Sequence, residues 1–158
     1  MSRSNRTATD KEGIQYRLEM EELGQHFKVW ILDGNIQVGW ATCILHADGM
    51  DLTDIIILEE PMLFPRGLWR VVPYTLYSRL KGKNYRRRGL GTELLKIVIE
   101  KARKKDVAYI RGYITNQGIA DNPKLLEWYR KHGFTVTPVA SPGPEMTDKV
   151  AWIQMDLR

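Results

Sequence analysis

The stretch Tyr85-Arg86-Arg87-Arg88-Gly89-Leu90-Gly91-Thr92 leads directly into an amphipathic run that extends to Lys104. Two glycines separated by one residue let the backbone turn tightly and bring its N–H groups close to a ligand, because neither carries a Cβ. A helix that begins there adds N–H groups without helical acceptors and the positive end of the helix dipole. Three arginines beside the turn favour an anion, and a phosphate suits their forked donors. The stretch therefore predicts a phosphate-binding turn between a strand and a helix.

Hydrophobic spacing places this turn in a series of strands and helices. Apolar residues recur at helical spacing over 92–105, with charged residues on the opposite side. A second helix is expected with Asn122 as its N-cap, Pro123 at its first position and Gly133 just past its end. The strands expected in this half are 75–81, 107–115, 134–139 and 150–157.

The N-terminal half predicts an antiparallel meander. Alternating residues from Gln15 indicate a strand, or a short helix that reaches Leu23. Asp33-Gly34 between the runs 27–32 and 36–45 is typical of a two-residue hairpin turn. A second turn is expected at 46–50 and a short strand at 55–59, and no convincing pair of helices is found between the first two strands. Residues 1–13 are polar and are expected to be flexible, which leaves 14–158 as a single domain.

Composition narrows the class of protein. The chain has 158 residues, 43% of them hydrophobic, which is enough for one substantial core. It has one cysteine, no segment long enough to cross a bilayer and no apolar secretory leader, so we expect a cytoplasmic protein without a membrane partner. The net charge is +5, and residues 61–92 contain eight basic residues and no acidic one. This uneven distribution fits an anionic ligand near the turn.

Comparison with known phosphate turns leaves one type. A Walker A loop is absent, and Leu94 stands where a dinucleotide fingerprint needs its third glycine. The run Arg86 to Gly91 has the pattern Arg, two residues, Gly, one residue, Gly, and in this it resembles the GNAT superfamily of acyl-CoA N-acyltransferases. Asn122, Tyr129 and Gly133-Phe134 match a second pattern of the family at the family's spacing. The resemblance covers about 76–136.

The resemblance implies a fold and a cosubstrate. The fold would be α/β (α+β), with a mixed, centrally splayed sheet of about six to seven strands, an antiparallel N-terminal meander and helices on the faces. The pyrophosphate of acetyl-CoA would lie on the main-chain N–H groups of 87–91, and its pantetheine arm between strands 75–81 and 107–115. The residues expected to contact the coenzyme are Leu80, Lys81, Gly82, Arg86, Arg87, Arg88, Gly89, Leu90, Gly91, Thr92, Asn122 and Tyr129.

The resemblance also implies an N-acetyltransferase in which an amine attacks the thioester directly. Tyr129 matches the family's thiol-protonating tyrosine, although a core aromatic on an apolar helix stripe is the alternative. The strand at 75–81 lacks the glutamate that often serves as general base, which leaves Glu59 and Glu60 as substitutes. No metal is expected, because the histidines show no ligand spacing.

The acceptor is inferred from charge. An acidic group near the expected acceptor side would attract a cationic amine, either a small molecule or a protein lysine or N-terminus. Its members are Asp48, Asp51, Asp54, Glu59 and Glu60. Two other functions stay open: a nucleic-acid-binding module, or a tRNA-directed acetyltransferase, that uses the basic block 66–88, and a protein that binds acyl-CoA without turnover. A homodimer is possible.

Overall fold

The computed structural model describes residues 6–59, 83–140 and 148–158 of the chain. These residues form two compact units, which are described separately below. Of the described residues, one unit contains 6–43, 54–59 and 83–98, and the other contains 44–53, 99–140 and 148–158. Two strands and one helix, β4, β5 and α2, contribute residues to both units.

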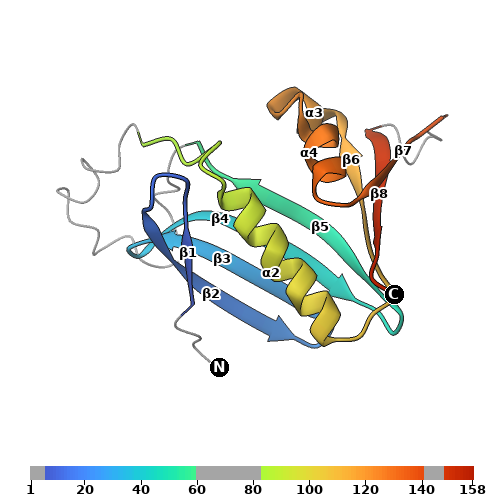
Figure 1. Ribbon diagram of the computed structural model, residues 1–158, viewed down its shortest axis with the longest axis horizontal. Helices are drawn as coiled ribbons and strands as arrows, with labels where there is room; N and C mark the ends of the chain where they lie inside the picture. The colour runs from blue at the N-terminus through green and yellow to red at the C-terminus, as the bar shows by residue number, and fades with distance from the viewer. Residues whose placement is uncertain (1–5, 60–82, 141–147) are drawn as a thin grey trace. The chain divides into compact units, whose positions relative to one another are not determined.

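The first unit is built on the meander. It contains β1 (Thr7–Thr9), β2 (Gln15–Leu23), β3 (His26–Asp33), most of β4 (Ile36–Leu45), the end of β5 (Gly49–Ile57) and the first part of α2 (Leu90–Lys104) (Figure 1). β1 pairs antiparallel with β2, and β2 with β3. Successive side chains of β2 point to opposite faces of the sheet. Tyr16 and Leu18 are buried on one face, whereas Gln15 and Arg17 are exposed on the other. The buried stripe of α2, which includes Leu94 and Val98, supplies the helical part of the core.

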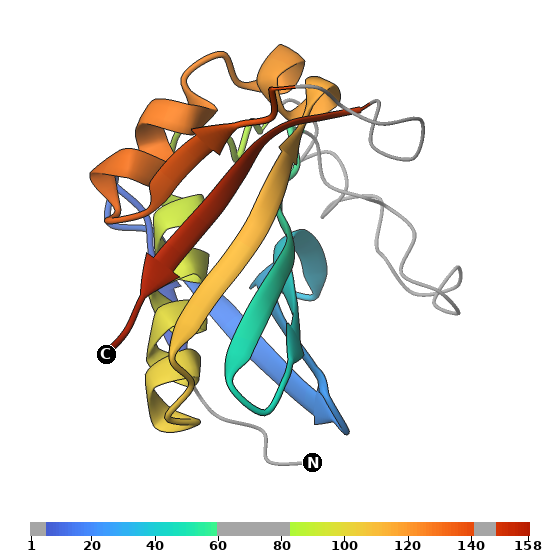
Figure 2. The same cartoon turned by 90° about the vertical axis from the view of Figure 1, so that its right-hand side faces the viewer.

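The second unit contains the remaining strands and two short helices. They are the start of β5, then β6 (Tyr109–Thr115), α3 (Asn116–Asp121), α4 (Leu125–Lys131), β7 (Thr135–Pro138) and β8 (Lys149–Asp156). Figure 2 shows β6 and β8 as adjacent long strands, and both β6–β8 and β7–β8 are antiparallel. β5 and β6 are parallel, with Gly49 opposite Tyr109 and Asp51 opposite Arg111.

The strands are hydrogen-bonded to their neighbours in the order β1-β2-β3-β4-β5-β6-β8-β7. The expected class is confirmed, because this is a mixed, splayed, mostly antiparallel sheet with helices and an N-terminal meander. Within the described residues the sheet has eight strands, because the N-terminal segment adds β1 to the strands expected there. Residues 6–59 contain only strands and their connections.

Several boundaries differ from the sequence-based expectation. Part of the segment expected to be flexible forms β1, and Asp10 behind it is buried because four donors satisfy its carboxylate. The strand expected at 55–59 begins at Gly49, because the preceding turn occupies only 46–48. Asn122 ends α3 instead of capping the next helix, and α4 starts at Leu125. The short helix α3 was not expected at all.

The parallel partner of β6 differs from the expected strand. This matters for function, because the pantetheine arm of the coenzyme was expected between these two strands. We expected 75–81 to lie beside it, but the parallel partner in the described residues is β5. Residues 75–81 lie outside the described part of the chain. Gly112 in β6 explains how closely the two strands approach, because a Cβ there would lie only 2.7 Å from the Leu52 carbonyl oxygen.

Candidate functional site

Tyr85 anchors the arginine turn, which comprises residues 84–89. This side chain is fully buried, and its ring packs edge-on against Tyr16 with the centroids 6.2 Å apart. Its hydroxyl donates to Asp33 Oδ2 at 2.9 Å, and Lys83 Nζ donates to the same oxygen at 2.7 Å. Burial, together with the hydrogen bond to Asp33, raises the pKa of Tyr85, so the phenol stays protonated at neutral pH. The residue before the arginines is therefore a structural anchor.

The Arg88 side chain points back into the protein. Its guanidinium donates to Asp10 Oδ2 at 3.3 Å and to Glu12 Oε2 at 2.7 Å, and its Nε donates to the Asn84 carbonyl at 2.7 Å. Asp10 also accepts from the Tyr16 hydroxyl and from two main-chain N–H groups. Burial raises the pKa of Asp10, but these donors outweigh it and the net pKa is lowered. Arg88 thus joins the turn to the segment 10–14.

Arg86 holds the other side of the turn. Its Nε donates to the Ile57 carbonyl at 3.1 Å, at the end of β5. Its Nη1 forms a 2.9 Å ion pair with Glu59 Oε1, whose side chain is 61% exposed. Two residues predicted from separate arguments, the turn arginine and the candidate base, are therefore brought together.

The backbone of the turn has features that are typical of an anion-binding site. Arg87 has φ 60° and Gly89 has φ 87°, and α2 begins at Leu90. The first N–H groups of a helix have no helical acceptor. Those of α2 include Gly91 and Thr92, whereas Leu90 is buried. Gly89, Gly91 and Thr92 are partly exposed, and the Arg87 side chain is exposed. An accessible nest of donors with one exposed guanidinium and a helix dipole behind it fits a diphosphate.

Lys11 adds a cation that the sequence did not suggest. Its main-chain N–H donates to the Arg88 carbonyl at 2.9 Å. Its side chain covers Gly89, because a Cβ added at Gly89 would lie 3.3 Å from Lys11 Cγ. The positive φ of Gly89 and this close cover both explain why a glycine stands there.

The other predicted contacts lie in the second unit or outside the described residues. Tyr129, on α4, is buried between Trp128 and Phe134, with ring centroids 4.8 and 5.3 Å away. Asn122 Oδ1 accepts from the Lys124 N–H at 3.2 Å, so its side chain serves the link between α3 and α4. Leu80, Lys81, Gly82 and Glu60 fall on 60–82, outside the described residues.

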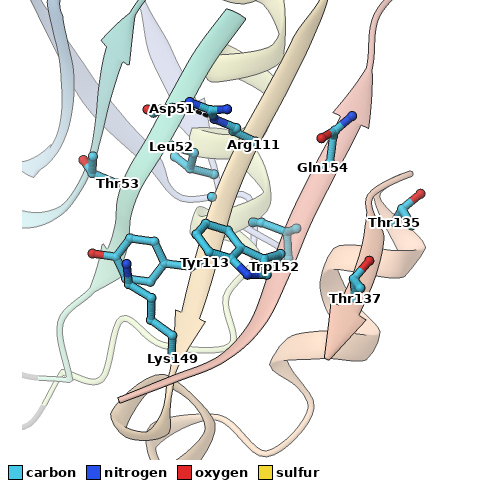
Figure 3. Close-up of a pocket in the computed structure, with 12 residues that line it drawn as sticks. Asp51, Leu52, Thr53, Arg111, Tyr113, Thr135, Thr137, Lys149, Trp152 and Gln154 are labelled. Atoms are coloured by element: carbon cyan, nitrogen blue, oxygen red, sulfur yellow. Dashed lines mark hydrogen bonds and ion pairs between the residues drawn. The ribbon is translucent and has the colours of Figure 1, made fainter. Parts of the chain in front are cut away.

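A groove of about 610 Å³ lies on the second unit (Figure 3). Strands β5, β6, β7 and β8 form its floor. Tyr113 and Trp152 meet edge-on at 6.1 Å, and Lys149 Nζ lies 4.1 Å from the Tyr113 ring centroid. Arg111 Nε donates to Asp51 Oδ1 at 2.7 Å, the ion pair drawn in Figure 3.

The residues that the structure covers show neither an arrangement typical of a metal site nor a membrane-spanning helix. No group of three or more potential ligand side chains is arranged to hold a metal ion. None of the helices described is both long and apolar enough to span a bilayer.

The sequence matches the model of the Acetyltransferase (GNAT) family over residues 4–134. The chain belongs to the GNAT acetyltransferase family. This confirms the resemblance that the motif at 86–91 suggested. No curated protein is significantly similar in sequence to this GNAT chain.

Solved structures show the same fold. The ribosomal-protein-S18-alanine N-acetyltransferase of Escherichia coli aligns with a TM-score of 0.56 at 16% identity, over 86% of this chain and 72% of that one. A GNAT family acetyltransferase from Elizabethkingia anophelis, with acetyl-CoA bound, aligns with a TM-score of 0.57 at 15% identity, over 90% and 98%. An aminoglycoside 6'-acetyltransferase type Ii aligns with a TM-score of 0.53 at 17% identity, over 85% and 71%. At these identities the similarity establishes the GNAT fold.

Sequence reasoning missed the residues that hold the turn of this GNAT protein. Asp10 and Lys11 stand in a polar segment whose composition predicts flexibility, and nothing local connects it to residues 78 positions later. The groove residues had a weak signal. Tyr113 and Trp152 occupy positions in β6 and β8 that alternate with buried residues, so two large aromatic rings are placed on the exposed face.

Proposed function

We propose that this protein is an acetyl-CoA-dependent N-acetyltransferase that moves the acetyl group to a primary amine by direct attack on the thioester. Membership of the GNAT acetyltransferase family supports the reaction class. The observation that carries the proposal is the accessible turn before α2, with Arg87 and Gly89 at positive φ and the helix beginning at Leu90. The solved neighbour that holds acetyl-CoA supports the choice of cosubstrate.

The turn is proposed to bind the pyrophosphate mainly through its main chain. Arg87 supplies an exposed guanidinium, and Lys11 supplies a second cation beside Gly89. Arg86 and Arg88 are proposed to act differently from the sequence-based expectation, because their side chains contact protein carboxylates and carbonyls. We assign them the role of fixing the turn, which keeps the N–H groups oriented before the ligand arrives.

The chemistry needs two proton transfers. The neutral amine attacks the thioester carbonyl, a C–N bond forms, the C–S bond breaks and the amine proton passes to a base. The departing thiolate takes a proton, and Tyr129 is proposed as its donor on the strength of its spacing from Asn122 and Gly133. Glu59 and Glu60 are retained as candidate bases. Leu80, Lys81 and Gly82 remain predicted pantetheine contacts, and β5 is the parallel partner of β6 in the described sheet.

Calorimetry tests the turn directly. Arg87→Met should weaken binding of coenzyme A by roughly tenfold or more, since a charge-assisted contact to phosphate is lost. Lys96→Met is the matched control, because Lys96 is an exposed lysine on α2 that pairs with Glu93. Wild type that takes up no coenzyme A would refute the proposal. An Arg87→Met variant that binds like wild type would refute the role given to this guanidinium.

Turnover is tested by release of free CoA thiol from acetyl-CoA in the presence of primary amines. Release that depends on both amine and enzyme supports transfer. Tight binding of acetyl-CoA without release for any amine would instead favour the non-catalytic alternative. The nucleic-acid alternative rests on the block 66–88, most of which lies outside the described residues.

A further inference from the structure

The groove on the second unit has a charge pattern that differs from the acidic acceptor side expected from the sequence. Asp51 is its only carboxylate among the lining residues described, and it is already engaged. Arg111 Nε lies 2.7 Å from one carboxylate oxygen, and His46 Nε2 lies 2.8 Å from the other. Burial raises the pKa of Asp51, but these partners outweigh it and the net pKa is lowered, so the carboxylate stays ionised and bound to its neighbours.

Lys149 leaves a positive charge in the groove that no described carboxylate pairs with. Its ammonium lies 4.1 Å from the Tyr113 ring centroid and 5.4 Å from that of Trp152. Arg111, Lys149 and Asp51 together give the groove lining a formal charge of +1 (two cations and one anion). Such a surface repels a polycation and attracts an anionic group.

The two aromatic rings give the groove an apolar surface. Tyr113 is 41% exposed and Trp152 is 39% exposed, which is unusual for neighbouring large rings on a sheet face. Thr135, Thr137 and Gln154 surround them with hydrogen-bonding groups. The volume of about 610 Å³ lies in the range of sites for small molecules rather than for a folded partner.

We propose that this groove binds the acceptor, and that the acceptor is a small primary amine that also carries an anionic group, a carboxylate or a phosphate. The anionic group would bind Lys149, with Arg111 adding positive potential, while an apolar portion lies on Tyr113 and Trp152. The inference rests on the proposed acetyltransferase function and names its substrate class. It also has a chemical advantage, because nearby cations favour the neutral form of an amine, which is the form that attacks.

The test compares amines that differ only in the anionic group. The pairs are phenylalanine with phenethylamine, for a carboxylate, and phosphoethanolamine with ethanolamine, for a phosphate; spermidine represents the polycations. Release of CoA thiol gives kcat/KM for each. We expect the anionic member of at least one pair to be preferred on the order of tenfold, through a charge-assisted hydrogen bond. The preferred pair then identifies the anionic group, and added salt should reduce the preference.

Variants connect the preference to the groove. Lys149→Met should abolish it through a higher KM, and Lys149→Arg should largely retain it. Lys96→Met, on the exposed side of α2, should leave it unchanged. Equal rates within both pairs, a preference for spermidine, or a preference that survives Lys149→Met would each overturn the inference.

A binding measurement keeps the inference testable if no amine is turned over. In two-dimensional NMR of the full chain, phenylalanine or phosphoethanolamine should shift the signals of Arg111, Tyr113 and Trp152. Phenethylamine and ethanolamine, which lack the anionic group, should not. Absence of such shifts overturns the inference, as do shifts with tRNA but not with the anionic amines. Calorimetry with coenzyme A on the same sample reports separately on the proposed function.

Discussion

Replacing Arg88 by methionine should destabilise the fold, in contrast to a change at an arginine that only binds phosphate. Methionine keeps the length of the side chain but removes the bonds to Asp10, Glu12 and the Asn84 carbonyl. Asp10 has a fully buried side chain, whereas the Glu12 side chain is 62% exposed. The cost therefore arises mainly at Asp10, because a buried carboxylate loses the guanidinium that pairs with it.

The magnitude follows from what Asp10 keeps. Three donors remain: the Tyr16 hydroxyl and the main-chain N–H groups of Glu12 and Ile14, at 2.9 Å each. Loss of one charged hydrogen bond costs about 1.5–3 kcal/mol, and loss of a partner from a poorly supported buried pair costs about 3–5 kcal/mol. With three donors left, we expect about 2–3 kcal/mol, or a fall in Tm of roughly 4–12 °C.

Thermal and urea unfolding measure this loss, with Arg17→Met as the matched control. Arg17 also forms an ion pair, with Glu19 at 3.2 Å, but both side chains are exposed, so its loss should cost about 0–1 kcal/mol. An Arg88→Met variant that unfolds like Arg17→Met would show that the pair with Asp10 does not hold the turn.

The pH dependence provides a second check of the same pair. The pKa of Asp10 is lowered from its usual 3.8, so its stabilisation is complete above that value and is lost as pH falls through the folded pKa. Without Arg88 the folded pKa should rise, because burial is then opposed by fewer donors. The acid-induced loss of stability carried by Asp10 should therefore be smaller in Arg88→Met and should be complete at a higher pH than in wild type. Identical acid profiles would contradict the assigned cause.

Three further predictions concern other positions. Arg87→Gly should stabilise the fold by up to about 1 kcal/mol in urea unfolding, since glycine adopts φ 60° without strain. Calorimetry should show weaker coenzyme A binding by the same variant. A loss of stability would contradict the view that Arg87 is strained in the native protein. Tyr129→Phe keeps the ring packing, so it should lower kcat without changing the affinity for coenzyme A; an unchanged kcat would leave Tyr129 a purely structural role. Gly112→Ala should lower the free energy of unfolding by roughly 1–3 kcal/mol, because its Cβ would meet the Leu52 carbonyl oxygen at 2.7 Å. A variant that unfolds like wild type would show that β5 and β6 can move apart freely.

The sequence predicted those elements whose signals are local. Alternation and turn residues placed the meander, and Arg86 to Gly91 placed the turn before α2. The observed β7 falls inside the expected range 134–139, and β8 begins and ends one residue before the expected range 150–157. Each of these depends on residues within a few positions of one another, which is where periodicity and turn chemistry are informative.

Contacts between distant segments could not be predicted in this way. Arg86 and Arg88 form ion pairs with Glu59 and Asp10, which are 27 and 78 positions away. A guanidinium beside a glycine turn has the same local sequence whether it binds a phosphate or a carboxylate of its own chain. The parallel partner of β6 was misassigned for the same reason, because two β-prone segments precede the turn and strand pairing is a long-range choice.

The link between the amino-terminal segment and the arginine turn has a consequence for deuterium exchange. The amides of Glu12 and Ile14 are held by the same carboxylate that holds the Arg88 guanidinium, and the amide of Lys11 is held by the Arg88 carbonyl. Opening of this segment therefore releases the turn. Any molecule that stabilises the closed turn must raise the free energy of opening for these three amides by the same amount, and so slow their exchange. The amides of residues 11–14 would thus report on occupancy at a helix that begins some eighty positions later.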